Sequence, residues 1–144
     1  MVLFQDGRII ISDDGRGIPF SGDEKKDQEI LNRIFSGYPI LNFQEVKISE
    51  VEDKGLKVVN SLCENLHICV RRNGYEFLQD FIRGIAQHKT IVSKTDQHSG
   101  TMLILKPDQT IFGEKRLSED IIKKWIETEK KNRKRFPEIS VMQK

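Results

Sequence analysis

The sequence predicts an α+β fold, a two-layer α/β sandwich in which a mixed, mainly antiparallel sheet carries helices on one face. Short β-rich runs occur in pairs around the turn dipeptides Asp6-Gly7 and Asn73-Gly74. In other segments, apolar residues recur at helical spacing. The resulting order, β-β-α-α-β-β-β-β-α, packs as layers around one core.

Composition excludes several classes of protein. The 144 residues carry 24 Lys plus Arg against 22 Asp plus Glu, with 37% hydrophobic and 32% charged residues. These values argue against a collagen, a low-complexity chain, full disorder or a strong single-sign field. No apolar run is long enough to span a bilayer, and the first residues lack a signal-peptide pattern, so we expect no membrane contact. Cys63 and Cys69 form no CxxC pair and no disulfide framework, so we expect a reduced, cytoplasmic chain.

The N-terminal elements are predicted from turn signals. Residues 2–5 and 8–12 form two strands of a hairpin. The following stretch, 13–19, is too rich in Gly and Pro for a regular element, and loops at strand ends often carry function.

Two helices follow in the predicted order. The first lies within 25–35 and is stopped by Gly37-Tyr38-Pro39, whereas 40–54 has no clear pattern. The second spans 56–66, on the apolar positions Leu56, Val58, Val59, Leu62, Cys63 and Leu66.

Strands dominate the next part of the chain. Residues 67–72 and 75–82 form a hairpin around Asn73-Gly74, and 90–94 and 101–106 are two more strands. A last helix begins after Ser118 as N-cap, with apolar residues at Ile121, Ile122, Trp125 and Ile126. We predict a domain over 1–129 and a basic C-terminal tail over 130–144.

The loop Asp13-Asp14-Gly15-Arg16-Gly17-Ile18-Pro19 is the strongest candidate site. A carboxylate at a strand end can accept a hydrogen bond from an exocyclic amine such as the N6 group of adenine. Glycines two residues apart let the backbone approach a flat ring without a Cβ clash. The alternative is a solvated turn, because Asp and Gly are ordinary turn residues.

Three separated blocks carry a resemblance to a known family. SDDGRGIP resembles the DxGxG box of the GHKL-type nucleotide-binding domain shared by DNA gyrase, heat-shock chaperones, sensor kinases and MutL, and its extension is similar to the bacterial gyrase B and topoisomerase IV B subunits. KGLKVVNSLCENLHICVRRNGYEFLQDFIRGI and SKTDQHSGTMLILKPDQTIF resemble the helix, hairpin and Thr-Gly-Thr strand that follow in that domain. The resemblance implies an incomplete GHKL ATPase fold.

The resemblance also implies roles for single residues. Asp13 would bond adenine through its N6 amine and share a water with Thr101, Gly17 would pack against the base, and Gly55 would be the last glycine of the phosphate lid. Val58, Val59 and Asn60 match the helix beneath the nucleotide. The implied nucleotide-binding set is Asp13, Arg16, Gly17, Ile18, Pro19, Gly55 and Thr101.

Departures from the family matter for activity. The family's Glu that activates water and its magnesium-binding Asn lie on a helix before the box, and these 144 residues hold no counterpart. Glu24, Glu29 and Asn32 follow the box and cannot take those roles. The stretch 46–55, equivalent to the Gly-rich lid, keeps one glycine and contains three carboxylates that would oppose a triphosphate. We therefore expect no catalytic residue and no magnesium, and we retain ATP or ADP as a candidate cofactor.

Three functional hypotheses stay open at this point. The first is a module that binds adenine nucleotide without hydrolysis and is not an active enzyme alone. The second is an interaction protein that exposes apolar surface, self-associates or docks on a gyrase-like partner, and binds no nucleotide. The third is that the assigned start codon omits an upstream helix that carries the catalytic residues.

Weaker signals are interpreted conservatively. His67, His88 and His98 lack metal-ligand spacing and are predicted to be solvated or strand-edge residues. Cys63 and Cys69 are predicted to be buried reduced thiols rather than a redox pair. Trp125 is predicted to lie in the core or an interface. The cluster Lys130–Arg135 could contact DNA, with a solvated helix end as the alternative.

Overall fold

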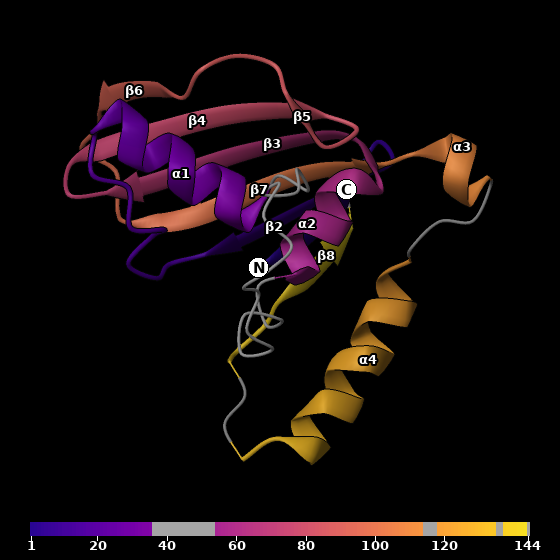
Figure 1. Ribbon diagram of the computed structural model, residues 1–144. Coiled ribbons are helices and arrows are strands. Elements are labelled where there is room, and N and C mark those ends of the chain that lie inside the picture. Colours follow the sequence, from indigo (N-terminus) through magenta and orange to yellow (C-terminus); the bar gives the residue numbers. More distant parts are fainter. Residues whose placement is uncertain (36–53, 114–117, 135–136, 144) are drawn as a thin grey trace, which may run out of the picture.

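The computed structural model describes residues 1–35, 54–113, 118–134 and 137–143. Its strands are β1 (Val2–Gln5), β2 (Arg8–Asp13), β3 (Cys63–Arg72), β4 (Tyr75–Ile82), β5 (Ile85–Ala86), β6 (Ile91–Lys94), β7 (Gly100–Pro107) and β8 (Val141–Gln143). Its helices are α1 (Glu24–Ile34), α2 (Lys54–Ser61), α3 (Gln109–Phe112) and α4 (Glu119–Asn132). Figure 1 shows α1 and α2 against the same face of the sheet.

One mixed sheet contains all the described strands. Its order is β5-β4-β3-β7-β2-β1-β8, and β6 also pairs with β4. The pairs within the described residues are antiparallel apart from β1 with β8, which is parallel. The predicted α+β sandwich with a mainly antiparallel sheet and helices on one face is therefore confirmed.

The core lies between this sheet and the two helices. Side chains alternate between the two faces of a strand, so residues opposite each other in register share a face. Across the sheet, Leu66 pairs with both Phe81 and Leu105, and all three are buried. Phe35, which directly follows α1, is fully buried and packs on Phe81 with ring centroids 6.1 Å apart.

Helix α1 begins where the sequence supplies a cap. The Asp23 carboxylate accepts from the backbone N–H of Lys26 at 3.0 Å. Asp27, one turn further, is buried, and its carboxylate accepts from the backbone N–H groups of Ser21 and Gly22 at 2.7 and 2.8 Å. The chain that enters α1 from the candidate loop is thereby held in one conformation.

The second predicted helix is too long. It was expected over 56–66, but α2 ends at Ser61 and β3 begins at Cys63. Leu66 pairs with two neighbouring strands, and Asp108 donates its backbone N–H to the carbonyl of Leu62 at 3.0 Å. Pairing with β4 and β7 satisfies the backbone along a whole strand, and this outweighs the local helical spacing.

Several elements were not predicted. They are β5, α3 and β8, all of four residues or fewer. The predicted tail over 130–144 contains the last turn of α4 and β8, which pairs with β1 through Val2 and Val141. The predicted N-cap of the last helix is confirmed, since Ser118 Oγ accepts from the Ile121 N–H at 3.4 Å. The predicted stop at 37–39 and residues 40–53 lie outside the described residues.

Candidate functional site

The candidate site forms where β2 and β7 end side by side. Asp13 is the direct partner of Thr101 in the antiparallel register, so both side chains leave the sheet on the helix-covered face. The next pair on that face is Ile11 with Leu103. Leu103 packs against the core, while Ile11 is 40% exposed. A carboxylate and a hydroxyl thus stand next to a partly open apolar surface.

Asp13 itself is exposed, and one of its oxygens is already used. Its Oδ1 accepts a hydrogen bond from the Gly15 N–H at 2.8 Å. A Cβ on Gly15 would lie 2.8 Å from the same oxygen, so a glycine permits this turn. The carboxylate therefore stabilises the loop, and its Oδ2 accepts no hydrogen bond from any of the described residues.

Two glycines let separate strands approach closely around Asp13. A Cβ on Gly17, which has φ +72°, would lie 2.7 Å from the Arg71 carbonyl oxygen. A Cβ on Gly100 would lie 2.3 Å from the Asp13 carbonyl oxygen. Gly17 therefore packs against the backbone of β3, and Gly100 closes the end of the β2–β7 pair.

Arg72 fixes the loop from the end of β3. Its Nη1 donates to the carbonyl oxygens of Arg16 at 3.1 Å and Gly17 at 3.2 Å. Arg72 was not predicted as a site residue, because a second arginine before the Asn73-Gly74 turn is typical of an ordinary strand end. No local signal relates it to a loop 55 residues earlier, so only the tertiary structure finds it.

Apolar residues anchor the exit of the loop. Ile18 packs against the core cluster, and Phe20 is buried with its ring 5.2 Å from that of Phe77. Arg16, which precedes these anchors, and Pro19, which lies between them, are exposed. The loop is therefore fixed at its exit by buried apolar side chains, whereas Arg16 and Pro19 are solvent-accessible.

Gly55 lies in the first turn of α2 and is exposed. No hydrogen bond or ion pair within the described residues links it to the loop 13–19. The preceding lid-equivalent residues, 46–53, lie outside the described part of the chain. The structure therefore brings together Asp13, Gly17 and Thr101 but leaves Gly55 unconnected to them.

Helix α2 has one polar group with an unusual environment. Val59 packs against the core, whereas Val58 is exposed. Asn60 is fully buried, and its Nδ2 donates to the Phe35 carbonyl at 2.9 Å. Its Oδ1 has no hydrogen-bond partner among the described residues, and a buried unsatisfied oxygen costs free energy. Asn60 therefore ties α2 to the end of α1.

The cysteines and the other possible metal ligands form no further site among the described residues. Cys63 and Cys69 are free and buried, as predicted. Among the described residues, no three His, Cys, Asp or Glu side chains converge on a possible metal position.

In the basic cluster at the end of α4, Arg133 Nε donates to Glu129 Oε2 at 2.8 Å, and residue 135 lies outside the described part. No helix in the described ranges is long and apolar enough to cross a membrane.

Comparison with known proteins identifies the fold. The chain is 32% identical over 127 residues to the DNA gyrase B subunit of Thermotoga maritima, which covers 85% of this chain and 20% of that protein. It is 32% identical over 117 residues to the DNA topoisomerase 4 B subunit of Caulobacter vibrioides, covering 78% of this chain and 17% of that protein. The 43K ATPase domain of Thermus thermophilus gyrase B, solved in complex with an aminocoumarin, superposes with a TM-score of 0.62 at 26% identity.

The chain has the fold of the gyrase B ATPase domain. The superposition covers 87% of this chain and 32% of the solved one. The chain thus spans about a fifth of the length of the curated relatives it matches. No protein-family model matches it. The gyrase-type resemblance inferred from the three sequence blocks is confirmed.

Proposed function

We propose that this chain binds an adenine nucleotide at the Asp13–Thr101 end of the sheet and does not hydrolyse it. The observation that carries the proposal is this pair standing beside Ile11 and Leu103 on one face. A carboxylate oxygen can accept from the exocyclic amine of adenine, and apolar side chains can lie against the ring. The similarity to a gyrase B ATPase domain supports the same ligand class.

The charge of the lid-equivalent stretch supports binding without turnover. Three carboxylates lie in the stretch just before α2, at Glu50, Glu52 and Asp53. The resemblance implies that this stretch would receive the phosphates. Like charges oppose a triphosphate, so we expect ADP to bind better than ATP. Hydrolysis also requires an activated water and transition-state charge stabilisation, which a general base and a metal usually supply.

Calorimetry with ADP tests the binding proposal. We expect weak binding, with a Kd on the order of 1 mM. Asp13→Asn removes a charged acceptor worth about 1.5–3 kcal/mol and should weaken binding about 10- to 100-fold. Asp14→Asn is the matched control, because Asp14 follows the strand and has no partner position on β7. Absence of heat at millimolar ADP, or unchanged binding in Asp13→Asn, contradicts the proposal.

Phosphate release tests the second half of the proposal. With ATP and magnesium, the chain should release no more phosphate than a protein-free blank. Release that depends on the amount of chain, and that falls in Asp13→Asn, would show that it hydrolyses ATP alone.

A second candidate function is an interaction module that never binds nucleotide. Ile121 and Trp125 lie one turn apart on α4 and are each 53% exposed, and Ile111 and Phe112 on α3 are also exposed. Exposed apolar side chains on one helix are typical of a docking surface for a second copy or a protein partner. DNA contact through Lys130–Arg135 and a cytoplasmic location stay predictions from the sequence.

Light scattering after size-exclusion separates the two candidates. An interaction module should show a mass that rises with concentration and returns to one chain in Trp125→Glu. The control is Lys124→Glu, which adds an acidic side chain at an exposed position on the same helix. A clean single-chain mass together with ADP binding supports the nucleotide proposal and excludes self-association.

A further inference from the structure

The edge of β4 carries a bulged return strand. β5 pairs with Phe81 and Ile82, and β6 pairs with Tyr75–Leu78, along the same edge. Gln79 and Asp80 lie between the two paired stretches, whereas residues 87–90 lie between Ala86 and Ile91. The four residues 87–90 on the return segment therefore lie opposite only two residues of β4, which makes this segment a bulge. Bulges at sheet edges redirect side chains and interrupt pairing.

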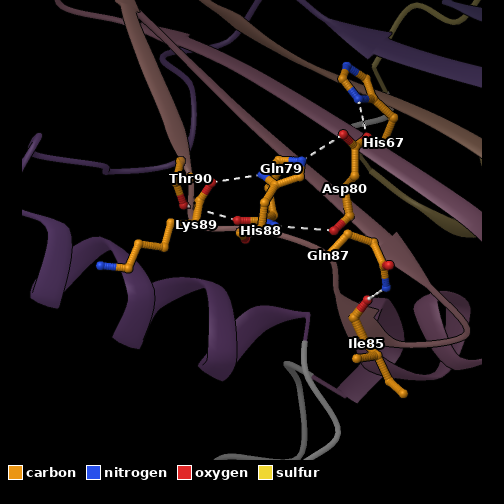
Figure 2. A network of polar contacts seen from close by, with 8 residues as sticks. All are labelled: His67, Gln79, Asp80, Ile85, Gln87, His88, Lys89 and Thr90. Carbon is orange, nitrogen blue, oxygen red and sulfur yellow. Dashed lines mark hydrogen bonds and ion pairs between the residues drawn. The ribbon is translucent and has the colours of Figure 1, made fainter.

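Side chains of β4 hold this bulge from both faces of the sheet. Gln79 is 1% exposed and lies between Phe77 and Phe81 on the core face, and its Nε2 donates to the His88 carbonyl at 2.7 Å. Thr90 Oγ1 donates to Gln79 Oε1 at 3.2 Å. Asp80 points to the opposite face and reaches the His88 ring (Figure 2). His88 is thus held by its carbonyl on one side and its imidazole on the other.

The His88 ring faces two acceptors. Its Nδ1 lies 2.7 Å from the Lys89 carbonyl oxygen, and its Nε2 lies 2.8 Å from Asp80 Oδ2. Neither a carbonyl nor a carboxylate has a proton to donate, so both ring nitrogens must carry one. The arrangement is complete only when His88 is an imidazolium.

We propose that the second proton on His88 is a latch that fastens the bulge 87–90, and with it β6, to β4. When that proton leaves, one ring nitrogen faces an acceptor without a hydrogen, and one of the two contacts is lost. A neutral ring also loses the charge that strengthens its bond to Asp80, so the bulge is held less firmly. The element next to the bulge is β6, an edge strand whose four residues are all exposed. Protonation of His88 therefore regulates how stably β6, which contains Ile91 and Val92, pairs with β4.

His67 shares the same carboxylate but does not need a second proton. Its Nδ1 lies 2.6 Å from Asp80 Oδ1, and this contact is satisfied by a neutral ring with its hydrogen on Nδ1. The histidines were predicted to be scattered, and the partner that His67 and His88 share was not predicted. They lie 21 positions apart in the sequence and meet on one carboxylate only through strand pairing.

The charges around the latch set the pH range in which it is fastened. Hydrogen bonds to Asp80 and to the Lys89 carbonyl raise the pKa of His88 above 6.5. Hydrogen bonds from His88 and His67 lower the pKa of Asp80 below 3.8, against the opposing effect of burial. Glu76, which is paired with Arg71, also interacts electrostatically with His67.

The sign of each pKa shift gives the pH range. A raised His88 pKa means that the stabilisation is complete below 6.5 and is lost as the pH rises through the folded value. A lowered Asp80 pKa means that its part is complete above 3.8 and is lost as the pH falls further. The latch is therefore fastened at mildly acidic pH and opens towards alkaline pH.

Backbone hydrogen exchange followed by NMR tests the latch. Opening constants are measured for the β6 amides from about pH 5.5 to about pH 8.5, after correction for the intrinsic exchange rate. We expect opening of β6 to increase severalfold over this range relative to the β3 amides of the same molecule. His88→Gln and Asp80→Asn should abolish the pH dependence, and the matched control His67→Gln should keep it.

Ring nitrogen shifts supply a measurement that needs no variant. At pH 6.5, the ordinary midpoint of a histidine, His88 should be more than half imidazolium. A neutral His88 at that pH overturns the proposal. It is equally overturned if β6 and β3 keep a constant ratio of opening across the pH range, or if only His67→Gln removes the dependence.

Discussion

Asp108 holds the corner between β7 and α3 through both of its carboxylate oxygens. Its Oδ1 accepts from the N–H and Oγ1 of Thr110 at 2.8 and 2.7 Å, and its Oδ2 accepts from Arg83 Nε at 2.7 Å. These hydrogen bonds, from Thr110 first and then Arg83, lower the pKa of Asp108 to about 2. The carboxylate therefore stabilises the fold more in its ionised form than when it is protonated.

Replacing Asp108 should change how the protein responds to acid. Because the pKa falls from 3.8 to about 2, its stabilisation is complete above 3.8 and is lost as the pH falls through about 2. Asp108→Asn should lower Tm at neutral pH and flatten the loss of stability across that interval. Thermal unfolding followed by circular dichroism checks this, with the exposed Asp96→Asn as control. Equal acid sensitivity in wild type and Asp108→Asn would contradict it.

The two thiols should be unreactive in the folded protein. Burial raises the pKa of Cys63 to about 11, and burial together with the hydrogen bond to Glu76 raises that of Cys69 to about 11. At pH 7 only roughly one thiol in 10,000 is then ionised, and the thiolate is the nucleophile. Iodoacetamide labelling followed by mass spectrometry should therefore find no adduct under native conditions and two in guanidinium. A rapid native adduct would show that one thiol is accessible and activated.

At the scale of elements, the candidate loop depends on a close approach that a matched glycine pair can measure. Gly7 and Gly17 have nearly equal φ, +73° and +72°, but a Cβ on Gly7 would meet nothing within 4 Å. On Gly17 it would lie 2.7 Å from a backbone oxygen of β3. Alanine would therefore incur the same cost for a positive φ at both positions, but only at Gly17 would its Cβ also clash with a neighbouring atom.

Alanine at these two positions should therefore separate the two costs. Gly7→Ala should lower the free energy of unfolding by about 1–2 kcal/mol, for the left-handed backbone alone. Gly17→Ala should cost about 1–3 kcal/mol more, because the loop must move away from β3. Urea unfolding measures both values. Equal losses would mean that the loop does not pack against β3 in solution.

At the scale of the whole molecule, β8 joins the last part of the chain to the first. Val141 pairs with Val2 and packs against the core, whereas its neighbour Met142 is 45% exposed. On α4, Ile126 is buried and Ile122 packs against the core. Residues more than a hundred positions apart therefore complete one edge of the sheet.

Truncating the two side chains of β8 should have unequal effects. Val141→Ala removes two methyl groups from the core and should lower the free energy of unfolding by about 1–2 kcal/mol. Met142→Ala removes a larger side chain that is 45% exposed and is not part of the core cluster, so we expect a smaller loss than for Val141→Ala, within about 0.5 kcal/mol. Denaturant midpoints compare the two. A larger loss for Met142→Ala than for Val141→Ala would contradict this register, because it would mean that Met142 and not Val141 faces the core.

The order of the elements and the candidate loop could be predicted from the sequence because their signals are local. Turn dipeptides marked the hairpins, apolar spacing marked α1 and α4, and Ser118 marked a helix start. The box beginning at Asp13 also carries its glycines within five residues. In each case the residues that set the conformation lie only a few positions apart in the sequence, so no knowledge of the remaining chain is needed.

Tertiary structure decided everything that depends on partners distant in the chain. It ended α2 at Ser61, because pairing with β4 and β7 stabilises Leu66 in a strand. It placed Arg72 on the carbonyls of the loop, and it brought His67 and His88 to one carboxylate. Pairing between strands brings the segments that make these contacts together, and such pairing is a property of the folded sheet rather than of any single segment.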